Sequence, residues 1–101
     1  MERVIRDGHV AVLFSPGHGA GWYSWHAIEE LLFDSSIVHW VESQEIDKIE
    51  SYVTLKYPNE YFSDLENLSI RWVPVGTEFR IDEYDGSESV VIKEEDHWLT
   101  A

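Results

Sequence analysis

The chain has 101 residues, of which 44% are apolar and 14% aromatic, a composition typical of a folded domain. Its 20 acidic and 7 basic side chains give a formal charge of −13, which argues against nucleic-acid binding and attraction to anionic membranes. The lack of cysteine excludes disulfides, thiol catalysis and thiolate metal sites. The apolar run at residues 10–14 is too short to span a membrane, and no charged-then-apolar leader opens the sequence. We expect a single domain, residues 1–101, in the cytoplasm.

The first half of the chain predicts two strands followed by helices. The strands, residues 3–7 and 9–14, flank Asp7-Gly8, a favoured two-residue hairpin turn. From residue 27 to residue 56 apolar residues recur with a helical period. This pattern predicts a helix from residue 27, a break with an N-cap at residues 34–36, and helices at 37–42 and 45–56. The side chains expected to face the core are Ile28, Leu31, Leu32, Ile37, Val38, Val41, Ile46, Ile49, Val53 and either Tyr52 or Tyr57.

The last third of the chain returns to β structure, with strands expected at residues 68–73, 77–84 and 87–93. A two-residue turn at Asp85-Gly86 pairs Ile81 with Val90 and Glu83 with Glu88. The predicted fold class is therefore α+β. We expect one antiparallel sheet of about five strands, with an insert of two to three helices between strands 2 and 3. A small sheet leaves its edges open, so we also expect a homo-oligomer.

Residues 15–26 (SPGHGAGWYSWH) combine alternating glycines with aromatic residues. The backbone N–H groups of such a loop suit a phosphate or ribose, and its rings suit stacking on a base, although the spacing matches no named nucleotide motif. In the alternative interpretation the tryptophans cap the core and neighbouring carboxylates neutralise the two arginines. The candidate ligand-binding residues are Gly17, His18, Gly19, Gly21, Trp22, Tyr23 and Trp25, with Arg71 and Arg80 as anion contacts.

The tip of the last hairpin is strongly acidic. Glu83 and Glu88 are opposed on its core face, where two like charges are unfavourable. Such a pair could hold a cation or an arginine of a partner, and the alternative is a solvated tip beyond the core. These two residues would extend into an acidic track that imitates phosphates, formed with Asp82, Asp85, Glu94, Glu95 and Asp96.

Nothing in the sequence predicts catalysis. The five histidines lack the spacing of a helical zinc site, and the loop serines Ser15 and Ser24 lack a nucleophile-elbow motif. We therefore expect a protein that is not an enzyme and that has no cofactor and no resident metal. A metal site assembled from distant residues stays open.

Three segments of the chain resemble a family of small uncharacterised proteins of phages and prophages. They are residues 10–25 (VAVLFSPGHGAGWYSW), 31–34 (LLFD) and 76–88 (GTEFRIDEYDGSE). The resemblance covers most of the chain and brings no established activity. It implies a bacterial host as the setting and a counter-defence role, because small acidic phage proteins often bind and block host machinery.

Two functional hypotheses follow from these patterns. In the first, the protein sequesters a small nucleotide-like molecule in the glycine- and tryptophan-rich loop. In the second, the protein is an acidic inhibitor that binds a basic host nuclease or another nucleic-acid-binding protein through Asp82, Glu83, Asp85 and Glu88.

Overall fold

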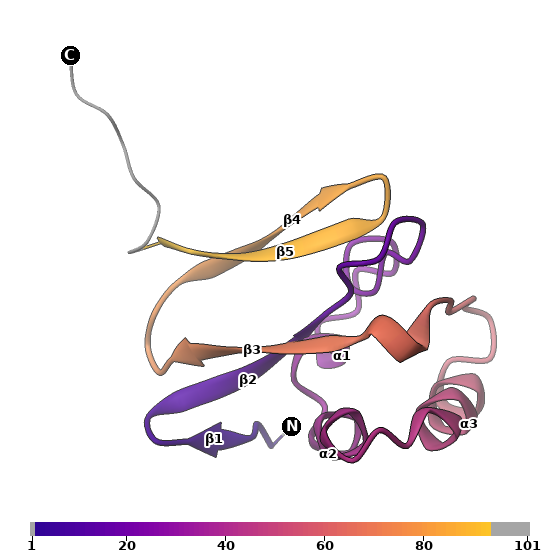
Figure 1. Ribbon diagram of the computed structural model, residues 1–101, viewed down its shortest axis with the longest axis horizontal. Helices are drawn as coiled ribbons and strands as arrows, with labels where there is room; N and C mark the ends of the chain where they lie inside the picture. The colour runs from indigo at the N-terminus through magenta and orange to yellow at the C-terminus, as the bar shows by residue number, and fades with distance from the viewer. Residues whose placement is uncertain (1, 94–101) are drawn as a thin grey trace.

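The computed structural model describes residues 2–93 and contains two antiparallel sheets (Figure 1). The first has the order β1-β2-β3, and the second is the β4–β5 hairpin. The strands are β1 (Ile5–Arg6), β2 (His9–Phe14), β3 (Ser69–Pro74), β4 (Phe79–Tyr84) and β5 (Ser87–Ile92). The α+β class and the helices between β2 and β3 are confirmed, but the expectation of one five-stranded sheet is wrong. Glu94, Glu95 and Asp96 of the predicted acidic track lie outside the described residues.

Both Asp-Gly turns form as predicted. Asp7 and Gly8 have φ angles of 49° and 74°, and Asp85 and Gly86 have φ angles of 49° and 82°. Two successive residues with positive φ make the two-residue turn that matches the twist of antiparallel strands. The turns set the pairing register, with Ile81 opposite Val90 and Glu83 opposite Glu88.

Strand β2 explains why the strands form two sheets. Ala11 and Leu13 belong to one buried cluster, whereas Val10 and Val12 belong to another. Alternate residues of a strand point to opposite faces, so β2 is buried on both sides. Figure 1 shows the β4–β5 hairpin on one side of the β2–β3 pair and helices α2 and α3 on the other. A hairpin added at the edge of the sheet would leave the valine face of β2 in water, which is why it folds over that face.

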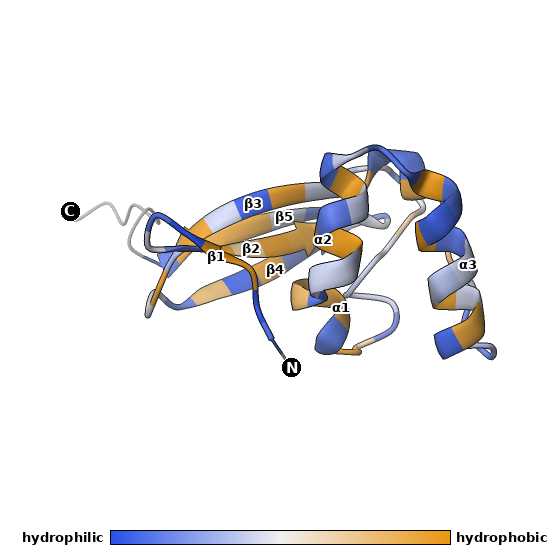
Figure 2. Cartoon of the chain, turned by 90° about the horizontal axis from the view of Figure 1, so that it is seen from below, coloured by the Kyte–Doolittle hydropathy of each residue, from blue (hydrophilic) through white to orange (hydrophobic). Residues whose placement is uncertain are grey.

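The helices are α1 (Glu30–Phe33), α2 (Ser35–Glu42) and α3 (Ile46–Lys56), followed by the 3₁₀ helix η1 (Leu65–Asn67). They gather at one end of the sheets (Figure 2). The first helix is shorter than expected, because Ala27 has a φ of 54°, which is incompatible with a right-handed helix. The predicted break is confirmed, since the Asp34 carboxylate accepts hydrogen bonds from the N–H groups of Ser36 and Ile37 and caps α2. No helix within residues 2–93 is long and apolar enough to cross a membrane.

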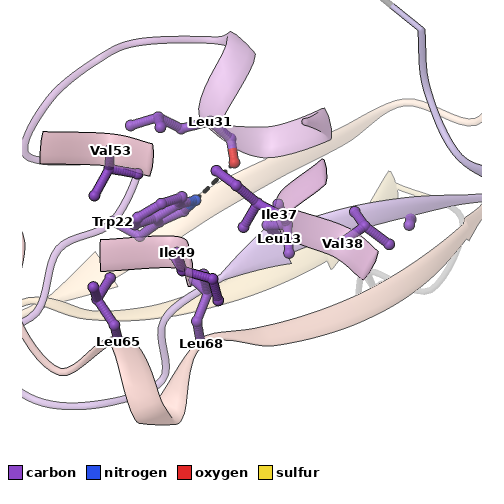
Figure 3. Close-up of a cluster of buried hydrophobic side chains, with 10 residues drawn as sticks. Leu13, Trp22, Leu31, Ile37, Val38, Ile49, Val53, Leu65 and Leu68 are labelled. Atoms are coloured by element: carbon purple, nitrogen blue, oxygen red, sulfur yellow. Dashed lines mark hydrogen bonds between the residues drawn. The ribbon is translucent and has the colours of Figure 1, made fainter. Parts of the chain in front are cut away.

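The larger hydrophobic cluster joins the helices to β2 (Figure 3). Leu13 of β2, Ile37 of α2 and both Ile49 and Val53 of α3 are fully buried there. Tyr52 and Tyr57, between which the sequence does not decide, both pack against this cluster and are partly buried. Leu13, which precedes residues 15–26, and Trp22, within them, both belong to this cluster, so the core anchors that segment.

Candidate binding surface

The glycine loop, residues 15–26, is docked against the tip of the β4–β5 hairpin (Figure 1). The N–H of Gly19 donates to the carbonyl of Asp85 at 2.7 Å, and the N–H of Gly21 donates to the carbonyl of Gly86 at 2.8 Å. A Cβ atom at Gly86 would lie 2.6 Å from the Gly19 nitrogen, so only glycine permits this approach. The loop is therefore part of a two-segment interface within the chain.

Glu88 of β5 is enclosed by this interface and is 2% exposed. One carboxylate oxygen accepts the Ser15 N–H at 3.0 Å, and the other accepts the N–H groups of Tyr23 and Ser24 at 2.8 and 2.7 Å. Backbone N–H groups arranged in this way form an anion site, and the three hydrogen bonds offset the loss of hydration of a buried charge. This anion site differs from the one predicted on the backbone of residues 17–21, where the N–H groups of Gly19 and Gly21 instead bind the Asp85 and Gly86 carbonyls.

The predicted pairing of Glu83 with Glu88 is confirmed, but their side chains have different roles. Glu83 is exposed, and one of its carboxylate oxygens accepts the Gly86 N–H at 2.6 Å. Glu88 turns toward the loop, so it does not face solvent as a partner-binding residue at the tip would. Asp82 and Asp85 are exposed, and Asp82 accepts a hydrogen bond from Arg80 at 2.8 Å.

The two loop tryptophans have opposite environments. Trp22 is 3% exposed, and its indole N–H donates to the Leu31 carbonyl at 2.7 Å (Figure 3). Its ring belongs to the core, as the structural interpretation of the loop predicts, and is not accessible for stacking on a ligand. Trp25 is 53% exposed and packs over Gly21. Tyr23 is partly buried between the two hydrophobic clusters.

A third segment, residues 57–64, completes this end of the molecule. Nδ1 of His26 lies 2.7 Å from a Glu60 carboxylate oxygen, and the His26 ring lies 4.5 Å from the Phe62 ring. The Ser63 hydroxyl donates to the Gly19 carbonyl. Sequence reasoning missed this segment because its contacts with the glycine loop span more than 30 residues, for example 34 between His26 and Glu60. Tyr61, an aromatic residue in a loop, is the sequence feature that could have indicated this segment.

The other candidate loop residues line this interface without forming an open cradle. His18 and Gly19 are exposed, whereas Gly17 is partly buried against Asp64 and Gly21 lies beneath the Trp25 ring. The predicted anion contacts lie elsewhere. Arg71 donates to the Val90 carbonyl at 3.0 Å in the middle of β5, and Arg80 bonds to Asp82. The structure therefore does not bring the two arginines to the loop.

A second polar cluster lies at the N-terminus of α2. The Tyr52 hydroxyl donates to the Asp34 carboxylate at 2.6 Å, and Lys56 Nζ lies 3.4 Å from a Glu30 carboxylate oxygen. Burial, followed by the hydrogen bond to Asp34, raises the pKa of Tyr52, and hydrogen bonding to Tyr52 raises the pKa of Lys56. Because Asp34 also caps α2, we interpret this cluster as a structural link between α2 and α3.

Within residues 2–93, no three histidine, aspartate or glutamate side chains lie together as a metal site requires. Comparison with known proteins gives no matching family model, no matching curated protein and no matching solved structure. The resemblance to small phage proteins therefore stays a prediction.

Proposed function

We propose that this protein is a non-enzymatic binding protein that recognises a basic protein partner through its acidic surface. The observation that carries the proposal is the imbalance of its charges. Each of the seven basic side chains contacts another group of the chain itself. The carboxylates outnumber them by 13, and most of those within residues 2–93 are exposed. These contacts involve Arg3 with Phe33, Arg6 with Glu42, Lys48 with Glu45, Lys56 with Glu30, Arg71 with Val90, Arg80 with Asp82 and Lys93 with Glu78.

The environment of the loop favours this proposal over sequestration of a small anion. A nucleotide phosphate would have to displace the hairpin carbonyls from the N–H groups of Gly19 and Gly21, or the Glu88 carboxylate from the other loop N–H groups. A base could stack on Trp25 but not on the buried ring of Trp22. Sequestration therefore requires the loop to open, whereas binding of a cationic partner does not.

The environment of the two loop serines argues against a role as catalytic nucleophiles and so favours a binding function. A serine nucleophile needs a hydrogen bond to a general base, which removes its proton. The hydroxyl oxygens of Ser15 and Ser24 are buried and have no hydrogen-bond partner among the described residues.

The setting that we propose, as the resemblance implies, is a bacterial host in which the protein blocks a basic factor of the defence machinery.

The test is a titration of the protein with nona-lysine by isothermal calorimetry, at low ionic strength and at about 0.15 M salt. We expect binding that weakens steeply as salt screens the charges. In parallel, cyclic and linear nucleotides are screened by thermal shift, where we expect no stabilisation. Absence of peptide binding at low salt would overturn the proposal, and stabilisation by a nucleotide would favour sequestration instead.

A further inference from the structure

Six large apolar side chains are exposed within residues 2–93, and the aromatic ones share one end of the molecule. Ile5 and Val75 both lie near the Asp7-Gly8 turn, where the Val75 N–H donates to the Gly8 carbonyl, and Leu55 lies on α3. The other three are Trp25, Tyr61 and Tyr84, with exposed fractions of 53%, 81% and 79%. Exposed rings that gather in one region mark interaction surfaces more often than scattered ones do.

These three rings come from three segments that hydrogen bonds hold together. Trp25 belongs to the glycine loop itself. Tyr61 lies between Glu60 and Phe62, both of which contact His26. Tyr84 precedes Asp85, whose carbonyl accepts the Gly19 N–H. We call Trp25, Tyr61 and Tyr84, with the exposed carboxylates Glu60, Glu83 and Asp85 that lie beside them in the chain, the aromatic-acidic end.

The aromatic-acidic end is pre-organised for binding. Glu88 fixes the loop to the hairpin with three hydrogen bonds from backbone N–H groups, and Glu83 closes the hairpin turn through the Gly86 N–H. A surface whose backbone is already ordered loses less conformational entropy when a partner binds. The basic side chains of the hairpin, Arg80 and Lys93, are paired with Asp82 and Glu78 further along its strands.

We propose that the aromatic-acidic end is the contact surface for an arginine-rich segment of a basic protein. A guanidinium group stacks flat on an aromatic ring and forms two parallel hydrogen bonds with a carboxylate, whereas a lysine ammonium is a compact and strongly hydrated charge. Carboxylates adjacent to an exposed ring, as at Tyr61 and Tyr84, suit a guanidinium group better than an ammonium group. This inference rests on the proposed function and adds to it a location and a preference for arginine over lysine.

The test compares nona-arginine with nona-lysine, which carry equal charge, by isothermal calorimetry. We expect nona-arginine to bind about five- to tenfold more tightly. The variant Trp25→Ala/Tyr61→Ala/Tyr84→Ala should lower its affinity to that of nona-lysine. The matched control, Ile5→Ala/Leu55→Ala/Val75→Ala, removes the other three exposed apolar side chains and should leave the preference unchanged. A second variant, Tyr61→Ala/Tyr84→Ala, leaves the loop intact and should lower the preference in part.

The outcomes separate the two proposals. If neither peptide binds, the proposed function fails and the contact surface fails with it. If both peptides bind with equal affinity, or if the control variant loses the preference as the aromatic variants do, the acidic binding function stands and the aromatic-acidic end is not its contact surface. Thermal unfolding of each variant confirms that it is folded before its affinity is compared.

Discussion

The carboxylate of Glu88 accepts a hydrogen bond from the backbone N–H of Tyr23 at 2.8 Å, across 65 residues of sequence. The same oxygen accepts the Ser24 N–H, so strand β5 and the glycine loop form one unit. This contact changes the role of the loop. The N–H groups that bind Glu88 and the hairpin carbonyls serve the fold, and the large apolar ring that the loop presents to solvent is that of Trp25.

Substitution Glu88→Gln should lower the free energy of unfolding by about 2–4 kcal/mol. Glutamine has the same size, but its amide NH₂ replaces one of the two accepting oxygens and leaves at least one loop N–H unpaired and buried. The measurement is urea unfolding followed by circular dichroism. The control Glu50→Gln, at an exposed position of α3, should change stability by less than about 0.5 kcal/mol. Equal stability of the two variants would contradict the role of Glu88.

Substitution Gly86→Ala should destabilise the protein more than Gly76→Ala does. The two glycines have nearly equal φ angles, 82° and 83°, so the backbone strain of about 1–2 kcal/mol is common to both. Only at Gly86 does the added Cβ meet another atom, the Gly19 nitrogen at 2.6 Å, whereas at Gly76 nothing lies within 4 Å. The difference between the two unfolding free energies therefore measures the docking of the loop. No difference would show that the loop and the hairpin are not in contact.

The tryptophans of the loop should respond in opposite ways to replacement by phenylalanine. Trp22→Phe removes the donor to the Leu31 carbonyl and leaves space in the core, and should lower the unfolding free energy by about 2–3 kcal/mol. Trp25→Phe, at a half-exposed ring, should lower it by less than about 1 kcal/mol. Chemical denaturation of both variants checks this order, and the reverse order would place Trp25 in the core.

The Tyr52 cluster predicts a loss of stability at alkaline pH. The pKa of Tyr52 is raised in the folded state by burial and by its hydrogen bond to Asp34, and that of Lys56 is raised by its hydrogen bond to Tyr52. A group whose pKa is raised by folding stabilises the protein fully below its unfolded pKa, about 10 for tyrosine and lysine, and loses this contribution as pH rises through the folded pKa. Stability should therefore fall above about pH 10, less steeply in Tyr52→Phe. Equal slopes in denaturation measured across this range would contradict the assignment.

Local chemistry in the sequence was sufficient to predict the turns, the hairpin register and the α2 cap. Asp7-Gly8 and Asp85-Gly86 define their turns without help from the rest of the chain, and Asp34 caps α2 through neighbours two and three residues away. The division into two sheets depends on distant contacts. The unbroken apolar run at residues 10–14 is the sequence feature that indicates this division. A strand with one solvated face alternates polar and apolar residues, whereas an unbroken run indicates a strand covered on both faces.

The roles of the site residues were less predictable, because they depend on contacts between segments that are distant in the sequence. The two-residue alternation places Glu88 on the same face as Val90 and Ile92, so its burial was implied by the register. The register does not predict which groups bind the Glu88 carboxylate, because backbone N–H groups carry no signature in the sequence. Likewise, nothing local distinguishes the buried Trp22 from the exposed Trp25.

The most direct test of the account is amide hydrogen exchange of Ser15, Tyr23 and Ser24, followed by NMR. With Glu88 bound to these N–H groups, they should exchange as slowly as amides of β2, and in Glu88→Gln they should exchange at least about tenfold faster. The Lys48 amide, which bonds to Glu45 at the start of α3, serves as a control that the substitution should not affect. Fast exchange of all three amides in the unmodified protein would mean that the glycine loop is open. It would contradict the pre-organised aromatic-acidic end and remove the argument against sequestration.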